Sequence, residues 1–152
     1  MDVIGMEWRW ESLYLTELVV AYVLTLPIAW DREQTSRSAG LRTFPLVAIA
    51  SCSYLLIARD MFEAEGLARA YYGLITGIGF IGGGAILKEG GSVKGTATAA
   101  SIWSTGALGA AVALNHYEIA VALSLMVFFT LRYVSVLKQV IKKDDCGSQN
   151  QD

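Results

Sequence analysis

The residues that could do chemistry gather in two short polar stretches of an otherwise apolar chain. One stretch runs from residue 31 to residue 43, and the other from residue 88 to residue 96. Each holds a basic–acidic pair, a glycine and a threonine that opens the next apolar segment. Charges of both signs at this density could bind an ion or the charged groups of a partner protein. The candidate site residues are Asp31, Arg32, Glu33, Arg37, Arg42, Thr43, Lys88, Glu89, Lys94 and Thr96.

The acids of these stretches allow two interpretations. Asp31, Glu33 and Glu89 could bind a hydrated Mg²⁺, because that ion accepts one or two carboxylates and keeps several waters. The alternative pairs the acids with the neighbouring arginines and lysines, which outnumber them. We favour pairing, and expect Arg37 and Arg42 to hold Glu89 or Asp31, because a guanidinium binds a carboxylate through two hydrogen bonds.

Lys94 lies just before the helix that we expect to begin at Thr96. A cation at a helix amino terminus is electrostatically unfavourable for the fold, so a role in holding an anion or a partner is one interpretation. The other is that Lys94 only helps to orient the chain in a membrane.

Catalytic and cofactor sites are not expected. Residues 90–96 place lysine before glycine, which is the wrong order for a phosphate-binding loop. Gly77, Gly79 and Gly82 match the letters of the dinucleotide-binding fingerprint but lack the preceding strand that it needs. One histidine, His116, and two cysteines do not make a cluster for zinc or iron. We therefore expect neither an enzyme nor a bound cofactor, and no nucleic-acid partner.

The elements that position these residues are predicted to be membrane-spanning helices. Hydrophobic residues make up 54% of the 152 positions and charged residues only 17%. Because a helix of about 20 apolar residues crosses a hydrocarbon core of roughly 30 Å, the composition predicts an all-α integral membrane protein with five spans. The expected spans are residues 13–30, 41–58, 67–87, 96–114 and 119–137, within a transmembrane domain of residues 1–143.

The third span is rich in glycine, which lets helix backbones approach closely in a membrane. At 100° per residue the glycines fall on two opposite faces of the helix. We therefore expect this helix to be central, with neighbouring helices packed against both faces. In the fourth span, Ala97, Ala100, Ser104, Ala107 and Ala111 are expected to form a close-packing face. The packing glycines are Gly73, Gly77, Gly79, Gly82, Gly83 and Gly84, together with Gly95 before the fourth span.

Basic residues predict the orientation. With five alternating spans, nine arginines and lysines lie on the side of the two polar stretches and three on the other. This bias predicts that the amino terminus faces out and the carboxyl terminus faces the cytoplasm, with residues 144–152 as a disordered tail. Glu17, inside the first span, is either a functional intramembrane carboxylate or an interfacial residue near the aromatic belt, and we favour the second.

The two polar stretches and the glycine-rich segment together resemble the membrane domain of the MgtC/SapB family. The similarity rests on Asp31-Arg-Glu33, Arg37-Ser-Ala-Gly-Leu-Arg-Thr43, Thr76-Gly-Ile-Gly-Phe-Ile-Gly-Gly-Gly-Ala-Ile86, Lys88-Glu-Gly90 and Thr98-Ala-Ala-Ser-Ile-Trp103. The family more often has Glu where this chain has Asp31, and many members add a cytoplasmic domain after the fifth span. The resemblance implies a bacterial inner-membrane protein linked to low magnesium and, in pathogens, to virulence.

Two functions are compatible with these residues. The first is a non-catalytic regulator that contacts another membrane complex; the resemblance implies the membrane ATP synthase as one such partner, and a homodimer is also expected. The second is an oligomeric transporter or channel for an ion or small solute. We favour the regulator, because five spans around a glycine- and alanine-rich centre leave little room for a lumen.

Overall fold

The computed structural model describes residues 3–35, 39–89 and 91–148, with side chains described for residues 13–35, 39–88 and 91–134. The chain folds into helices and one short hairpin. The predicted all-α class is thus confirmed, with a hairpin where the sequence predicted only a polar loop. The elements are α1 (Val3–Thr35), α2 (Thr43–Met61), α3 (Ala64–Gly84), β1 (Leu87–Glu89), β2 (Ser92–Lys94), α4 (Thr96–Ala113) and α5 (Tyr117–Ser148).

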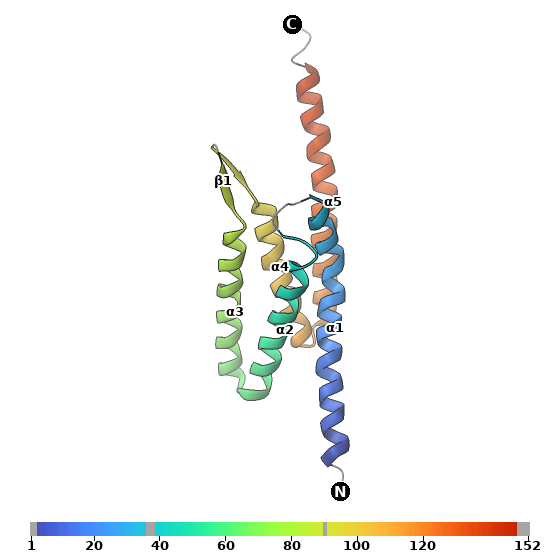
Figure 1. The fold of residues 1–152 in the computed structure, drawn as a ribbon, viewed down its shortest axis with the longest axis vertical. Helices are drawn as coiled ribbons and strands as arrows, with labels where there is room; N and C mark the ends of the chain where they lie inside the picture. Colours follow the sequence, from blue (N-terminus) through green and yellow to red (C-terminus); the bar gives the residue numbers. More distant parts are fainter. Residues whose placement is uncertain (1–2, 36–38, 90, 149–152) are drawn as a thin grey trace.

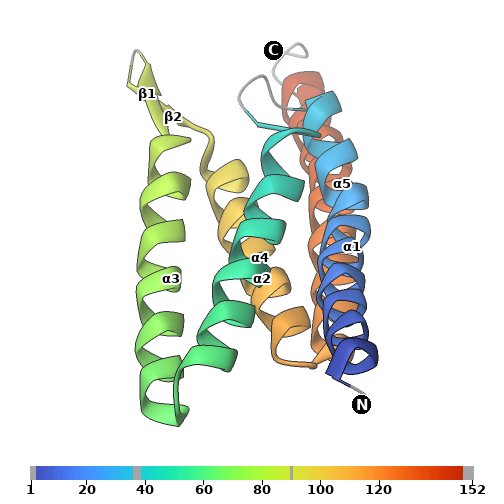
Figure 2. The same ribbon diagram turned by 60° about the horizontal axis from the view of Figure 1, so that its bottom comes forward.

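The five helices stand side by side and alternate in direction (Figures 1 and 2). The end of α1, the start of α2, the β1–β2 hairpin and the late part of α5 lie together at what we call the hairpin end. The α2–α3 and α4–α5 turns lie at the opposite, turn end. Both polar stretches of the sequence therefore reach the same end of the bundle.

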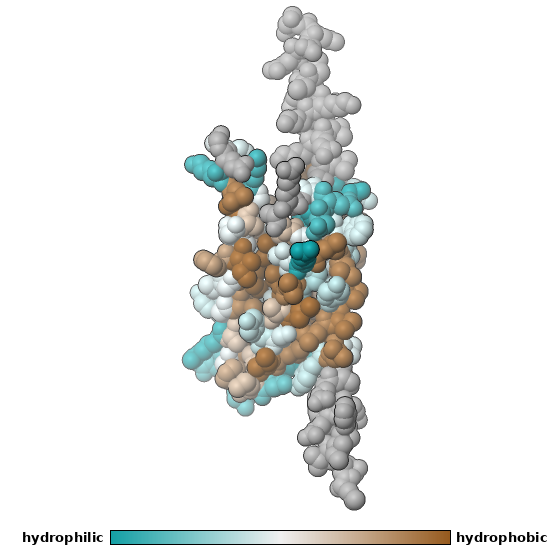
Figure 3. Space-filling view, viewed as in Figure 1, coloured by the Kyte–Doolittle hydropathy of each residue, from teal (hydrophilic) through white to brown (hydrophobic). Residues whose placement is uncertain are grey.

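Three helices are long and apolar enough to cross a membrane: Leu13–Thr35 within α1, Thr43–Met61, and Tyr117–Val134 within α5. Apolar side chains cover much of the bundle surface between its two ends (Figure 3). The fold is thus that of a membrane protein, and the crossing of all five helices remains a prediction.

The central helix is α4, not the glycine-rich α3 that the sequence singled out. Along α4 the buried residues include Ile102, Thr105, Leu108 and Val112, whereas in α3 only Ile78 and Gly82 are buried. Helix α3 lies at one edge, beside α2 and α4 (Figure 2). The prediction of a central α3 was wrong. Glycines show that another helix can approach the backbone closely, but they do not show whether that helix belongs to the same chain.

Close packing in this chain depends on two glycines of α4. A Cβ atom at Gly109 would overlap the carbonyl oxygen of Ala48 in α2, and one at Gly106 would overlap the side chain of Ile78 in α3. At Gly109 α4 therefore meets α2 at backbone distance, whereas Gly106 makes room for the Ile78 side chain.

The close-packing face predicted for α4 was largely wrong. Ala97 and Ala100 are exposed, and Ser104 and Ala107 are only half-buried. The buried face instead carries Thr98, Ser101, Ile102, Thr105 and residues 108–113. The hydroxyl groups of Ser101 and Thr105 donate to the carbonyl oxygens of Ala97 and Ser101 within the helix, at 2.7 and 2.8 Å. Because these bonds satisfy the hydroxyls locally, small polar residues can face the core.

Helix α5 continues to Ser148, so residues 144–148, expected in a disordered tail, are helical. Residues 149–152 lie outside the described residues. The segment Tyr117–Val134 is mostly exposed.

Candidate functional site

At the hairpin end, Asp31 and Arg32 form a buried ion pair in the last turns of α1. The Arg32 guanidinium donates to Asp31 Oδ2 at 2.7 Å from Nη2 and at 3.2 Å from Nε. The two side chains are only 7% and 4% exposed. Because removing one partner of a buried pair leaves an uncompensated charge, each residue holds the other in place.

Glu33 closes the connection between α1 and α2. Its Oε2 atom accepts a hydrogen bond from the backbone N–H of Leu41 at 2.9 Å. The carboxylate lies against Gly40, where any Cβ atom would overlap it. The glycine is therefore needed for this close approach, and Glu33 has a structural partner.

The predicted arginine pairing is not what the described residues show. Asp31 pairs with Arg32, its neighbour in sequence, and Arg42 forms no ion pair with a described carboxylate. Arg37 and the side chain of Glu89 lie outside the described residues. Thr43 opens α2 behind Arg42. Arg42 is thus an exposed cation at the start of α2.

The hairpin projects from the bundle beyond α3 and α4 (Figure 1). Its strands pair in antiparallel register, with Lys88 opposite Val93 and Leu87 opposite Lys94. Gly95 has φ = +85°, and a Cβ atom there would overlap the carbonyl oxygen of Ala85. Gly95 therefore makes the sharp turn that starts α4 at Thr96, with Lys94 just before it.

Of the three candidate magnesium ligands, Asp31 and Glu33 are described, and the side chain of Glu89 lies outside the described residues. Among the residues whose side chains are described, no group of three His, Cys, Asp or Glu could hold a metal ion. Asp31 is bound by Arg32, and Glu33 is bound by the Leu41 N–H. Their arrangement closes the loop after α1 rather than presenting carboxylates to an ion.

A second charged cluster lies at the turn end. Glu17 of α1 is only 6% exposed, and its Oε1 atom lies 3.3 Å from Nη1 of Arg59 in α2. The same Nη1 atom donates to the carbonyl oxygen of Ala113 at 2.7 Å. One guanidinium thus joins α1, α2 and the end of α4.

Asn115, in the α4–α5 turn, completes the cluster. Its backbone has φ = 60°, a left-handed conformation that asparagine tolerates. When its amide is oriented to suit both neighbours, it donates to Glu17 Oε1 at 3.3 Å and accepts from Arg59 at 3.1 Å. The turn is therefore tied to the same ion pair.

The side chain of Glu17 faces the bundle interior and pairs with Arg59, and its interfacial depth in a membrane stays a prediction. Two sequence features point to the cluster: an acid within an apolar run, and an arginine in the last turn of the next apolar helix. Their pairing requires that α1 and α2 be antiparallel neighbours. No sequence feature indicates that the Ala113 carbonyl and the Asn115 turn take part in this cluster.

Helix α3 carries most of the predicted packing glycines on two sides: Gly73 and Gly77 line the side toward α2, and Gly79 and Gly83 lie on another side. A Cβ atom would meet no described residue within 4 Å at Gly73, Gly77, Gly79, Gly83 or Gly84. Only Gly82 is packed, with a Cβ position 3.1 Å from the carbonyl oxygen of Ala99. Phe80, on the same helix, is 86% exposed. The chain alone thus leaves a smooth, apolar helix face without a partner among the described residues.

These features can be compared with known proteins. The sequence profile described as "MgtC family" matches residues 18–140, which include the Asp31–Arg32 pair, the glycine-rich helix and the hairpin. The chain belongs to the MgtC family. The resemblance inferred from the sequence motifs is thereby confirmed.

Several relatives share this domain. A Synechocystis protein, slr0014, is 38% identical over 122 residues, covering 80% of this chain and 51% of its own length. The Escherichia coli K12 protein named "Putative magnesium transporter YhiD" is 31% identical, covering 78% and 59%. Protein MgtC of Salmonella typhimurium is 32% identical, covering 75% and 49%. This MgtC-family chain thus spans about half to three-fifths of these relatives. No solved structure matches it significantly.

Proposed function

We propose that this protein is a non-catalytic membrane regulator in magnesium homeostasis that acts by binding another integral membrane protein through α3. The magnesium link rests on the family and on the name of YhiD. The observation that carries the binding role is the side of α3 that bears Gly79 and Gly83, where a Cβ atom would meet no described residue within 4 Å. A second copy of the chain and a complex such as the membrane ATP synthase are the candidate partners, and virulence in a pathogen would be a downstream effect.

The physical reason is that helices associate in lipid through close backbone contact rather than through the hydrophobic effect. Gly79 and Gly83, four residues apart, form a GxxxG surface on an edge helix. Phe80 stands beside them and offers a large apolar side chain. Such a surface fits an apolar helix of a partner.

A transporter is the second candidate, favoured by the name of YhiD. Against it, Ile102, Leu108 and Val112 fill the space around the central helix, and the larger described cavity lies between α2 and α3 rather than along the bundle axis. A path for ions would therefore have to form between copies. Magnesium uptake into proteoliposomes containing only this protein would favour the transporter over the regulator.

We predict that all five helices cross the bacterial inner membrane, with the amino terminus outside and the carboxyl terminus in the cytoplasm. The basic hairpin end then faces the cytoplasm. Alkaline phosphatase fused after Lys143 should be inactive, and the same enzyme fused in the α4–α5 turn at His116 should be active. The reverse pattern would contradict the orientation.

Blocking the α3 face tests the regulator directly. Gly83→Leu should insert and fold normally, because the space beside Gly83 is open, but should abolish rescue of growth in low magnesium in a strain lacking the protein. Ala122→Leu adds the same bulk at an exposed position of α5 and should rescue normally. Equal rescue by both variants, at equal membrane abundance, would show that the α3 face has no role.

A further inference from the structure

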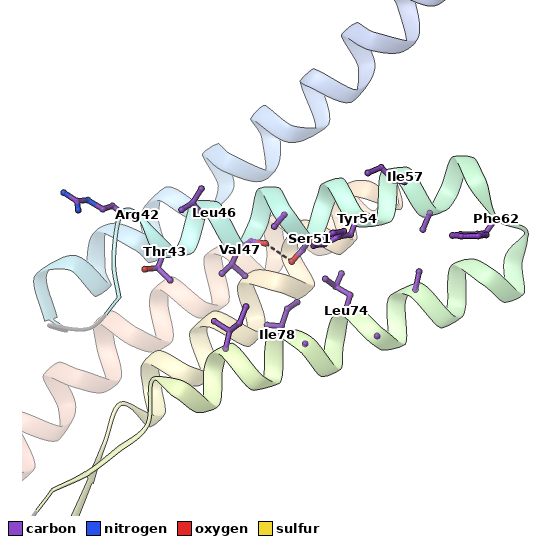
Figure 4. A pocket seen from close by; sticks show the side chains of 16 residues that line it. Arg42, Thr43, Leu46, Val47, Ser51, Tyr54, Ile57, Phe62, Leu74 and Ile78 are labelled. Atoms are coloured by element: carbon purple, nitrogen blue, oxygen red, sulfur yellow. Dashed lines mark hydrogen bonds between the residues drawn. The ribbon is translucent and has the colours of Figure 1, made fainter.

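A groove runs along the outside of the bundle, between α2 and α3. Its volume is about 740 Å³, within the usual range for a ligand-sized site. Figure 4 shows Arg42 and Phe62 at opposite ends, with Leu74 and Ile78 of α3 directed toward α2. Since α2 has 19 residues, the groove follows roughly 28 Å of helix, close to the thickness of a hydrocarbon core.

The lining of the groove is almost wholly apolar. Leu46, Val47 and Ile81 are typical of it, and Gly73 and Gly77 form part of its floor on α3. Ser51 and Tyr54 carry the hydroxyl groups near its mid-length, and the Ser51 hydroxyl donates to the carbonyl oxygen of Val47 at 2.7 Å. The Ser51 hydroxyl already has a hydrogen-bond partner within its own helix. The middle of the groove is therefore suited to a hydrocarbon chain.

The hairpin end of the groove has the opposite character. Arg42 is exposed there, and among the described residues no carboxylate lies within ion-pair distance of it. Thr43 adds a hydroxyl group beside it. An unpaired arginine at this level attracts an anionic lipid headgroup, and its planar guanidinium can hold a phosphate through two hydrogen bonds.

We propose that this groove binds one anionic phospholipid of the leaflet at the hairpin end, with the phosphate on Arg42 and an acyl chain along Leu46, Val47 and Ile81 toward Gly77. The occupant has one negative group followed by a long apolar chain, which matches an exposed cation followed by an apolar groove. This site is separate from the Gly79–Gly83 face and does not depend on the proposed regulatory function.

The test uses the full chain reconstituted with equal amounts of phosphatidylglycerol and phosphatidylcholine, extracted into mild detergent and weighed by native mass spectrometry. We expect the wild type to retain phosphatidylglycerol about fivefold more than phosphatidylcholine. Arg42→Gln should remove this preference, whereas Arg42→Lys should keep most of it. Arg69→Gln, which removes an exposed arginine at the turn end, should leave the preference unchanged.

Filling the groove provides an independent arm. Gly77→Leu places a side chain in the groove without meeting a described residue, so it should fold and lose retention of both lipids. Gly79→Leu has equally open space, does not line the groove, and should retain lipid as the wild type does. Unchanged retention in both Arg42→Gln and Gly77→Leu would overturn the proposal. So would a groove occupied by a second copy, seen as loss of a dimer in Gly77→Leu with lipid retention unaltered.

Discussion

Replacing Gly109 by leucine should abolish the folded protein. The first side-chain atom alone would overlap the carbonyl oxygen of Ala48, and that atom belongs to the backbone of the neighbouring helix. Because α2 cannot move aside without opening the core around Leu55 and Leu108, we expect a loss of about 3 kcal/mol or more. The measurement is the yield of monodisperse protein after extraction into mild detergent.

Gly79→Leu is the matched control for this experiment. It makes the same chemical change in the glycine-rich helix, where a Cβ atom meets no described residue within 4 Å. Its yield and thermal stability should equal those of the wild type. If Gly79→Leu were as damaging as Gly109→Leu, α3 would be packed on that side within one chain, contrary to the arrangement described above.

Arg59→Ala should produce the second large effect. The substitution leaves Glu17 as a buried charge without its cation and removes the donor to the Ala113 carbonyl. Glu17 is buried although Arg59 is 29% exposed. Because a buried charge left unpaired costs up to roughly 3 to 5 kcal/mol, the apparent Tm in detergent should fall. In the double variant Glu17→Gln/Arg59→Ala the unpaired charge is gone, and more than half of the loss should be recovered.

Arg69→Ala is the comparison for Arg59→Ala. Arg69 also forms an ion pair, with Glu65 at 2.6 Å, but both side chains are about four-fifths exposed. Exposed pairs contribute less than about 1 kcal/mol, so this variant should unfold close to the wild-type temperature. Similar losses in both arginine variants would mean that the Glu17 cluster is as solvated as the surface pair.

The helices were predictable from sequence because each carries a long apolar run bounded by charges, glycine or a short turn. Helix α4 begins at Thr96 as predicted, since Gly95 can adopt the left-handed conformation that a turn requires. The end of α3 was placed three residues too late, because Leu87 continues the apolar run although it belongs to β1. Hydropathy alone does not separate an apolar strand from the last turn of a helix.

Which helix is central could not be predicted. The sequence shows where small residues lie, and both α3 and α4 are rich in them. Only the packing shows that Gly109 meets Ala48 whereas Gly79 meets no described neighbour. A membrane protein uses small residues both for helix contacts within its chain and for contacts with other chains. A run of small residues in the sequence does not distinguish the two.

Of the predicted ion pairs, only those of Asp31 fall on described side chains, and its partner was not the one predicted; pairing of Glu89 with Arg37 or Arg42 stays a prediction. Both polar stretches lie at one end of the bundle, as the alternation of the helices requires. Asp31 pairs with its neighbour Arg32, and Glu33 accepts a hydrogen bond from the backbone of Leu41. Both partners are close in the sequence, so these contacts do not require the two polar stretches to meet. The Glu17–Arg59 pair depends on the placement of three helices, which the sequence does not specify.

The most direct test of the central claim is photo-crosslinking from α3 in living cells. A photoreactive amino acid at Phe80, which is 86% exposed, should capture one defined integral membrane protein, either a second copy or a subunit of another complex. The same probe at Met126, 68% exposed on α5, should capture only lipid, and Gly83→Leu should abolish capture from position 80. No specific crosslink at position 80, or the same products from both positions, would contradict the proposal that α3 is the partner-binding face.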